Sequence, residues 1–175
     1  MKAEKLYRSA WALLENLTPL PIDCGALCGG ACCDDGGQDD AGMYLFYKEE
    51  LMYKNNPDSI CIEESEFLYG DDDTRALIAM CPGKCKRSAR PLACRIFPLT
   101  PYLENGELKI ITDPRAKSVC PMAKVMKKDE YSPEFVRNVE RTFKLLMKNK
   151  VFRDFMNSYS EYLSEYLRFF PDSHN

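Results

Sequence analysis

This chain of 175 residues has a single histidine, no long apolar run and no large excess of one charge. His174 is the only histidine, which excludes zinc sites built from two cysteines and two histidines and catalysis by a histidine general base. No run of about 18 or more apolar residues occurs, so we expect no transmembrane helix and no membrane partner. Glu4, Arg8 and Glu15 interrupt the first 17 residues. We therefore expect no signal peptide and a cytoplasmic location.

The charge balance and the missing catalytic motifs narrow the function further. With 24 Lys and Arg against 27 Asp and Glu, the net charge is −3, so we expect no nucleic-acid partner. No Ser-His-Asp arrangement, phosphate-binding loop or paired-carboxylate motif is present, and the residues by themselves predict no catalytic group. The composition, 45% hydrophobic and 29% charged, is typical of a globular protein. The length predicts a single domain, residues 1–175.

Apolar side chains at helical spacing predict helices at both ends of the chain. Residues 2–17 carry such a stripe, and Pro19 and Pro21 end it. Ser132-Pro133 begins a helical region, residues 132–170, with two amphipathic helices whose aromatic stripes we interpret as core. The first stripe is Phe135, Val136, Val139, Phe143, Leu146 and Met147, and the second is Phe152, Phe155, Met156, Tyr159, Leu163, Tyr166, Leu167 and Phe170.

Short strands and turns are expected between these helices. Residues 43–47 predict a strand and residues 48–54 a helical turn, whereas residues 81–101 are expected to be mostly irregular. Two hairpins are predicted, at residues 59–69 and 74–80 and, around Asn105-Gly106, at residues 99–103 and 108–112. The fold class is therefore α+β: a small irregular Cys-rich lobe with short hairpins, residues 18–125, braced by an N-terminal helix and two C-terminal helices.

Nine cysteines are the most unusual feature of the composition. A chain of this length can bury a core without cross-links, and clustered thiols in a reducing compartment bind metal or perform redox chemistry more often than they form disulfides. Short spacings let one loop direct two thiolates at one metal ion. Eight cysteines follow such spacings: Cys24, Cys28, Cys32 and Cys33, then Cys81, Cys85, Cys94 and Cys120. Cys61 stands between two isoleucines and is predicted to fill the core.

A basic and proline-rich run, from Lys84 to Pro98, surrounds Cys94. Arginines near thiolates lower thiol pKa values and offset negative charge, so Arg90 and Arg95 are expected to support the ligands. The other cations of the run, Lys86 and Arg87, are equally well explained as solvated side chains. Prolines on both sides predict a rigid loop around Cys94, with Phe97 shielding the site from water.

These motifs together resemble the zinc- or iron-chelating cysteine-cluster proteins of the YkgJ-like family (CxxCxxCC type). The resemblance covers roughly residues 24–121 and departs from the family in the first block, where three residues instead of two precede the vicinal pair. It implies eight metal-ligating cysteines, and the matching positions are Cys24, Cys28, Cys32, Cys33, Cys81, Cys85, Cys94 and Cys120. A similar cysteine region in flagellin lysine N-methylases implies a possible methyl transfer.

The identity of the metal stays open at this stage. Zinc takes four thiolates in a closed structural site, and eight cysteines suffice for two such sites; an iron–sulfur cluster, including a 4Fe-4S cluster, also takes four cysteines. Aspartates of the segment 34–40 are either oxygen ligands for iron or part of a solvated loop, which is the interpretation we favour. Three functions remain: a protein module with a structural zinc or iron centre, an iron–sulfur redox or methyl-transfer enzyme, and a metal carrier or store.

Overall fold

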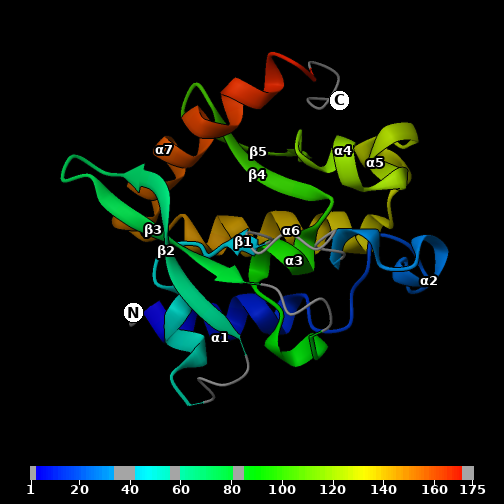
Figure 1. Cartoon of the computed structure of the whole chain (residues 1–175), viewed down its shortest axis with the longest axis horizontal. Coiled ribbons are helices and arrows are strands. Elements are labelled where there is room, and N and C mark those ends of the chain that lie inside the picture. Colours follow the sequence, from blue (N-terminus) through cyan, green and yellow to red (C-terminus); the bar gives the residue numbers. More distant parts are fainter. Residues whose placement is uncertain (1–2, 34–41, 56–59, 81–84, 171–175) are drawn as a thin grey trace.

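Two small antiparallel sheets lie among helices in the computed structural model, which describes residues 3–33, 42–55, 60–80 and 85–170 (Figure 1). One sheet has three strands in the order β1-β3-β2, and the other has two, β4 and β5. The strands are β1 (Gly42–Tyr44), β2 (Cys61–Tyr69), β3 (Thr74–Met80), β4 (Leu99–Glu104) and β5 (Glu107–Thr112). The predicted α+β class is confirmed.

The three long helices occur where the periodicity predicts them. They are α1 (Ala3–Leu13), α6 (Pro133–Leu146) and α7 (Lys150–Leu167). Helix α6 contacts α1 and β5, while α7 contacts β2 and β4. The remaining helices of the described residues are short: α2 (Gly25–Cys28), η1 (Ala31–Cys33), η2 (Glu49–Tyr53), η4 (Arg87–Ala89), α3 (Leu92–Ile96), α4 (Ala116–Val119), α5 (Pro121–Val125) and η5 (Lys128–Glu130).

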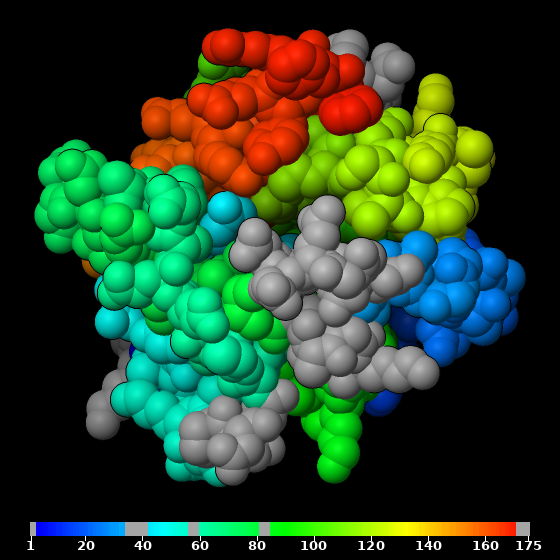
Figure 2. Space-filling model, in the orientation of Figure 1, coloured from blue at the N-terminus to red at the C-terminus, as the bar shows by residue number. Residues whose placement is uncertain are grey.

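Both predicted hairpins form. In β4–β5, Leu99 pairs with Thr112 and Glu104 pairs with Glu107. Asn105 (φ 53°) and Gly106 (φ 81°) both have positive φ at the turn, as the tight hairpin turns that favour Asn-Gly require. In β2–β3, Tyr69 pairs with Thr74, and the turn end of this hairpin projects from the body of the molecule (Figures 1 and 2).

The aromatic stripes of α6 and α7 form the centre of the core, as predicted. Phe46, which follows β1, lies among Phe143, Phe152, Phe155 and Tyr159, with its ring centroid 5.1 Å from that of Phe143. These five side chains are almost completely buried. Aromatic groups of this kind contribute large buried areas and prefer the edge-to-face contacts seen here.

Within the described part of the chain, none of the helices has both the length and the apolar character that crossing a membrane requires.

Two sequence predictions are wrong. Cys61 does not fill the core: it is exposed on β2, and its Sγ lies 3.5 Å from a carboxylate oxygen of Glu63. Successive side chains of a strand point to opposite faces, and here Ile60 faces inward. The described part of the run 81–101, residues 85–101, is also not mostly irregular: it contains η4, α3 and the start of β4, and α3 places Cys94 on a helix that Pro91 precedes.

Glu49 is a fully buried carboxylate that joins three separate segments. Its oxygens accept hydrogen bonds from Nε1 of Trp11 on α1 (3.1 Å), from the backbone N–H of Phe46 (3.2 Å) and from that of Leu92 at the start of α3 (2.5 Å). Burial raises the pKa of Glu49 from 4.5 to about 7, although these three hydrogen bonds oppose the shift. The position of α3, and hence of Cys94, depends on this side chain.

We expect Glu49→Gln to lower the free energy of unfolding by about 1–3 kcal/mol, because the amide turns an NH2 group toward a buried donor. The substitution also removes a pH dependence. A carboxyl whose pKa is higher in the folded chain contributes stability that is complete below about pH 4.5 and is lost as the pH rises through about 7. Denaturant unfolding over this pH range measures both effects.

The matched control is Glu66→Gln, which changes an exposed glutamate on β2. It should leave the stability and its pH dependence close to those of the natural chain. If Glu49→Gln and the natural chain lose stability equally between these pH values, the assignment of the titration to Glu49 is wrong.

Candidate metal centre

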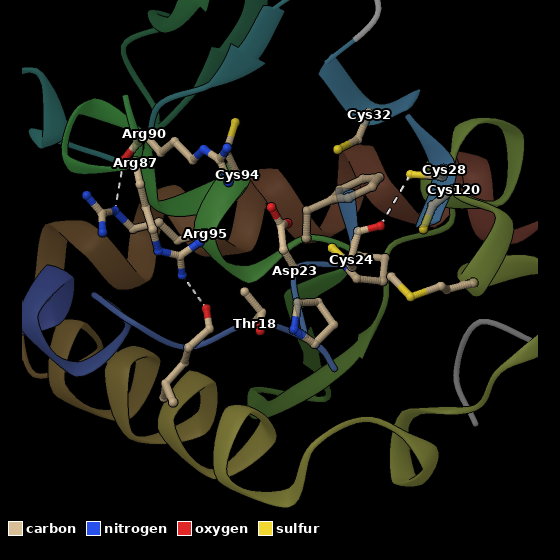
Figure 3. A pocket seen from close by; sticks show the side chains of 15 residues that line it. Thr18, Asp23, Cys24, Cys28, Cys32, Arg87, Arg90, Cys94, Arg95 and Cys120 are labelled. Carbon is tan, nitrogen blue, oxygen red and sulfur yellow. Dashed lines mark hydrogen bonds between the residues drawn. The ribbon is translucent and has the colours of Figure 1, made fainter. Parts of the chain in front are cut away.

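One cavity collects cysteines from separate parts of the chain (Figure 3). Its volume is about 50 Å³, well below the roughly 300–1,000 Å³ of pockets that hold drug-sized ligands. The size therefore fits an ion rather than an organic cofactor. The cysteines that line the cavity are Cys24, Cys28, Cys32, Cys94 and Cys120. The charged side chains that line it are Asp23, Arg87, Arg90 and Arg95.

Helix α2 brings the first thiols together. Cys24 and Cys28 lie one helical turn apart, and the Sγ of Cys28 lies 3.7 Å from the carbonyl oxygen of Cys24. A carboxylate oxygen of Asp23 accepts a hydrogen bond from the N–H of Gly25 (3.0 Å) and so holds the start of the helix. Gly29 (φ 67°) then ends α2 in the left-handed conformation that glycine adopts without strain.

Cys120 approaches the cavity from the opposite end of the Cys-rich sequence. It lies between α4 and α5, where Pro121 begins α5, and only 5% of it is exposed. Helices α2, α4 and α5 occupy adjoining positions at one end of the molecule (Figures 1 and 2). Burial, followed by the charge of Asp23 and the thiols of Cys28 and Cys120, raises the pKa of Cys24.

Of the vicinal pair Cys32-Cys33, Cys32 lines the same cavity. The two sulfur atoms are 4.0 Å apart. A hydrogen bond with Cys32 lowers the pKa of Cys33 to about 6, with a further contribution from the charge of Arg90. Burial by itself lowers the pKa of Arg90. A hydrogen bond with Cys85 and the charges of Cys85, Cys33 and Cys94 outweigh this effect, so the pKa of Arg90 is raised. Arg90 is therefore under the influence of three thiols, and its expected support of metal ligands stays a prediction.

The other two arginines of the cavity hold the backbone rather than sulfur. Arg95, predicted to support the ligands, has its guanidinium 4.3 Å from the ring centroid of Trp11 and donates to the carbonyl oxygens of Arg90 and Ser88 (2.9 and 3.0 Å). Arg87, which the sequence allowed to be a merely solvated side chain, instead forms hydrogen bonds with the backbone. It donates to the carbonyl oxygens of Leu14, Glu15 and Leu17, in the segment that follows α1.

The predicted ligands are thus only partly brought together. Five line the cavity, Cys33 and Cys85 interact with Arg90, and Cys81 lies outside the described residues, as do His174 and the aspartates of segment 34–40. In residues 3–33, 42–55, 60–80 and 85–170, no three His, Cys, Asp or Glu side chains lie close enough to one another to hold a metal ion. Phe97 lines the cavity, and its expected shielding of the site from water stays a prediction.

Sequence reasoning missed one charged residue of the cavity, Asp23. Asp23 carried a signal, because an aspartate two residues before a glycine is typical of a turn that begins a helix. Comparisons of the chain with protein-family models, curated proteins and solved structures gave no match.

In the chelator-treated protein at pH 7, we expect iodoacetamide to modify Cys33 faster than Cys61. The thiolate is the reactive form, and the pKa of Cys33 is lowered to about 6, whereas a hydrogen bond with Glu63 raises the pKa of Cys61. Exposure alone would give the opposite order, because Cys61 is the more exposed. Peptide mass spectrometry over a time course measures both rates.

Arg90→Gln is the diagnostic variant for this order. Removing the guanidinium charge should raise the pKa of Cys33 and slow its alkylation, while the rate at Cys61 stays the same. Faster modification of Cys61 than of Cys33 in the natural chain would show that Arg90 and Cys32 do not activate Cys33.

Proposed function

We propose that this chain is a metal-binding protein that holds zinc or iron through its clustered thiolates, in a centre with a structural role. The observation that carries the proposal is that five cysteines, from positions 24 to 120, line one cavity. Thiolates are the ligands of structural zinc sites and of iron–sulfur clusters. The small volume of the cavity favours a metal centre over the methyl-transfer alternative, which needs an organic methyl donor.

We infer further that the eight cysteines form two groups of four. In Figure 3 the side chains of Cys24, Cys28, Cys32 and Cys120 lie toward one side of the cavity, and Cys94 lies with the arginines toward the other. The second group joins Cys94 to Cys33 and Cys85, which share the influence of Arg90. The sequence spacing Cys81-x3-Cys85 supplies its fourth member. The vicinal pair would then connect the two centres.

The charges near the thiols fit a metal centre. Four thiolates around a divalent ion leave a net negative charge, which nearby cations and N–H donors offset. Arg90 lies among Cys85, Cys33 and Cys94, and its buried Nε has no hydrogen-bond partner. A donor of this kind next to three thiols is suited to thiolates. Bound metal would supply cross-links between α2, α3 and the α4–α5 segment.

One observation favours the carrier or storage alternative. Cys32 is exposed, and helix α2 lies at the periphery of the molecule (Figure 1). A carrier must release its metal to a partner, so its site has to be accessible, whereas a closed structural site exchanges metal slowly. The rate at which a competing chelator removes the metal separates these two functions. A cytoplasmic location would keep the thiols reduced in either case.

Anaerobic purification, elemental analysis and a visible spectrum test the metal assignment. We expect stoichiometric zinc in a colourless protein or, for a cluster, iron with broad absorption near ~400 nm. Cys94→Ser and Cys120→Ser should each reduce the metal content by about one equivalent and lower the melting temperature, because structural metal binding is coupled to folding.

Cys61→Ser is the matched control, because Cys61 lies on β2 away from the cavity and is exposed. It should leave the metal content and the melting temperature unchanged. The proposal fails if the natural chain contains no zinc or iron after anaerobic purification and binds neither metal when it is added. Unchanged metal content in Cys94→Ser would remove that residue from the ligand set.

A further inference from the structure

The two-stranded sheet has two outer edges, and the fold treats them differently. The β4–β5 hairpin lies between α7 and α6 (Figure 1), with α7 in contact with β4 and α6 in contact with β5. An edge strand presents a row of unpaired N–H and C=O groups, which native proteins usually cover or protect. An edge that stays uncovered is therefore a place where another chain can pair.

Pro101 on β4 determines which backbone groups point away from the hairpin. It pairs with Ile110, and because proline has no N–H, these two residues cannot exchange a pair of backbone hydrogen bonds. Bonded and non-bonded pairs alternate along antiparallel strands, so the pair Leu103 and Leu108, two residues further on, is non-bonded as well. The N–H and C=O groups of Leu108 and Ile110 consequently point outward from β5.

Helix α7 covers the edge of β4, whereas the edge of β5 is open. The outward N–H of Leu103 donates to Oγ of Ser160 on α7 (2.9 Å), which agrees with the alternation derived above. On β5, no residue of the described ranges forms a hydrogen bond with the outward N–H or C=O of Leu108 or Ile110. Two donors and two acceptors are thus available along this edge.

A cavity of about 380 Å³ opens at this edge of β5. Residues 108–111 form its wall on the strand, while Lys128 of η5 and Glu140 and Lys144 of α6 line it as well. The volume lies within the roughly 300–1,000 Å³ of pockets that hold ligands. The open backbone groups therefore adjoin a recess that has room for a short extended segment.

The charge of this cavity is positive. Its charged side chains are Lys109, Lys128, Lys144 and Glu140. The carboxylate of Glu140 lies 3.9 Å from Nζ of Lys144, and both side chains are substantially exposed. Lys128 forms no ion pair within the described part of the chain. Complementary charge selects partners, so this recess favours an acidic one. A second copy pairing here would instead bring like-charged lysines together, which is unfavourable.

We propose that the open edge of β5 is a docking site for an acidic, extended segment of another protein, which adds as a strand beside β5. In strand addition, main-chain hydrogen bonds give affinity and alternate side chains give specificity. Leu108 and Ile110 supply the main-chain donors and acceptors, and the lysines of the cavity select carboxylates. None of these residues lines the thiol cavity, so the two sites are separate.

Fluorescent hexapeptides, as long as the six residues of β5, test the proposal. A pool randomised among Glu, Asp, Val and Thr should bind the full chain saturably, as measured by anisotropy at low salt. The same pool with methylated backbone nitrogens should lose this binding, because it keeps the charge and lacks the main-chain donors. A pool with Lys in place of the acidic residues should not bind.

Charge reversal tests the contribution of the cavity. In the double variant Lys128→Glu and Lys144→Glu, we expect the acidic pool to bind about 10-fold more weakly at low salt. The matched control is Lys54→Glu, since Lys54 is exposed and does not line the cavity. It should leave the affinity unchanged. An equal loss in Lys54→Glu would contradict the proposed site.

Amide hydrogen exchange locates the bound peptide. At a peptide concentration about ten times the dissociation constant, exchange at Leu108 and Ile110 should slow by about 10-fold, while Lys109 and Ile111, whose amides face β4, should change little. The proposal is refuted if the acidic pool does not bind, or if it binds without protecting these two amides. Their protection in a dimer of the chain without peptide would assign the edge to a second copy and also refute it.

Discussion

The buried carboxylate of Glu49 is the constraint on which the cysteine region depends. It accepts three hydrogen bonds, one from a side chain of α1 and two from backbone N–H groups, and the shortest reaches the first residue of α3. A buried polar group is costly unless it is hydrogen-bonded, so these three hydrogen bonds favour the joined arrangement of the segments. Because Cys94 lies in the middle of α3, a side chain that touches no thiol determines where one of the central thiols stands.

Two arginines of the cavity bond to the backbone, and the third is influenced by thiols. Arg87 satisfies carbonyl oxygens beyond the end of α1, and Arg95 stacks on Trp11 while bonding two further carbonyl oxygens. These contacts tie the segment 87–95 to α1 and leave Arg90 as the arginine most strongly influenced by the cysteines. Arg90 is half-buried and interacts with Cys85, Cys33 and Cys94, so the acidity of Cys33 and the properties of any metal bound there should both respond to it.

The sequence predicted those parts of the fold whose information is local. Periodic apolar side chains identified α1, α6 and α7, and Asn105-Gly106 identified the β4–β5 turn, because each of these depends on neighbours within a few residues. Cys61 was misplaced since the inward face of a strand follows from its register with the sheet, and shifting by one residue inverts it. Spacing grouped Cys24 with Cys28, but it contained no information on the approach of Cys120, which requires the chain to fold back through the α4–α5 segment.

The contrast between the two parts of the molecule explains why thiols are concentrated where they are. Helices α6 and α7 bury continuous stripes and need no additional constraint. Helix α2 and η1 bury no side chain at all, and helices of three or four residues are not stable by themselves in water. The described hydrogen bonds that order them are few, such as those of Gly25 with Asp23 and of Gly30 with Gly25. Metal coordination would supply what burial does not, because each metal–thiolate bond replaces a missing core contact with a strong directional one. Such a segment would be ordered by its metal and would loosen when the metal leaves, so metal binding and local folding would be one equilibrium.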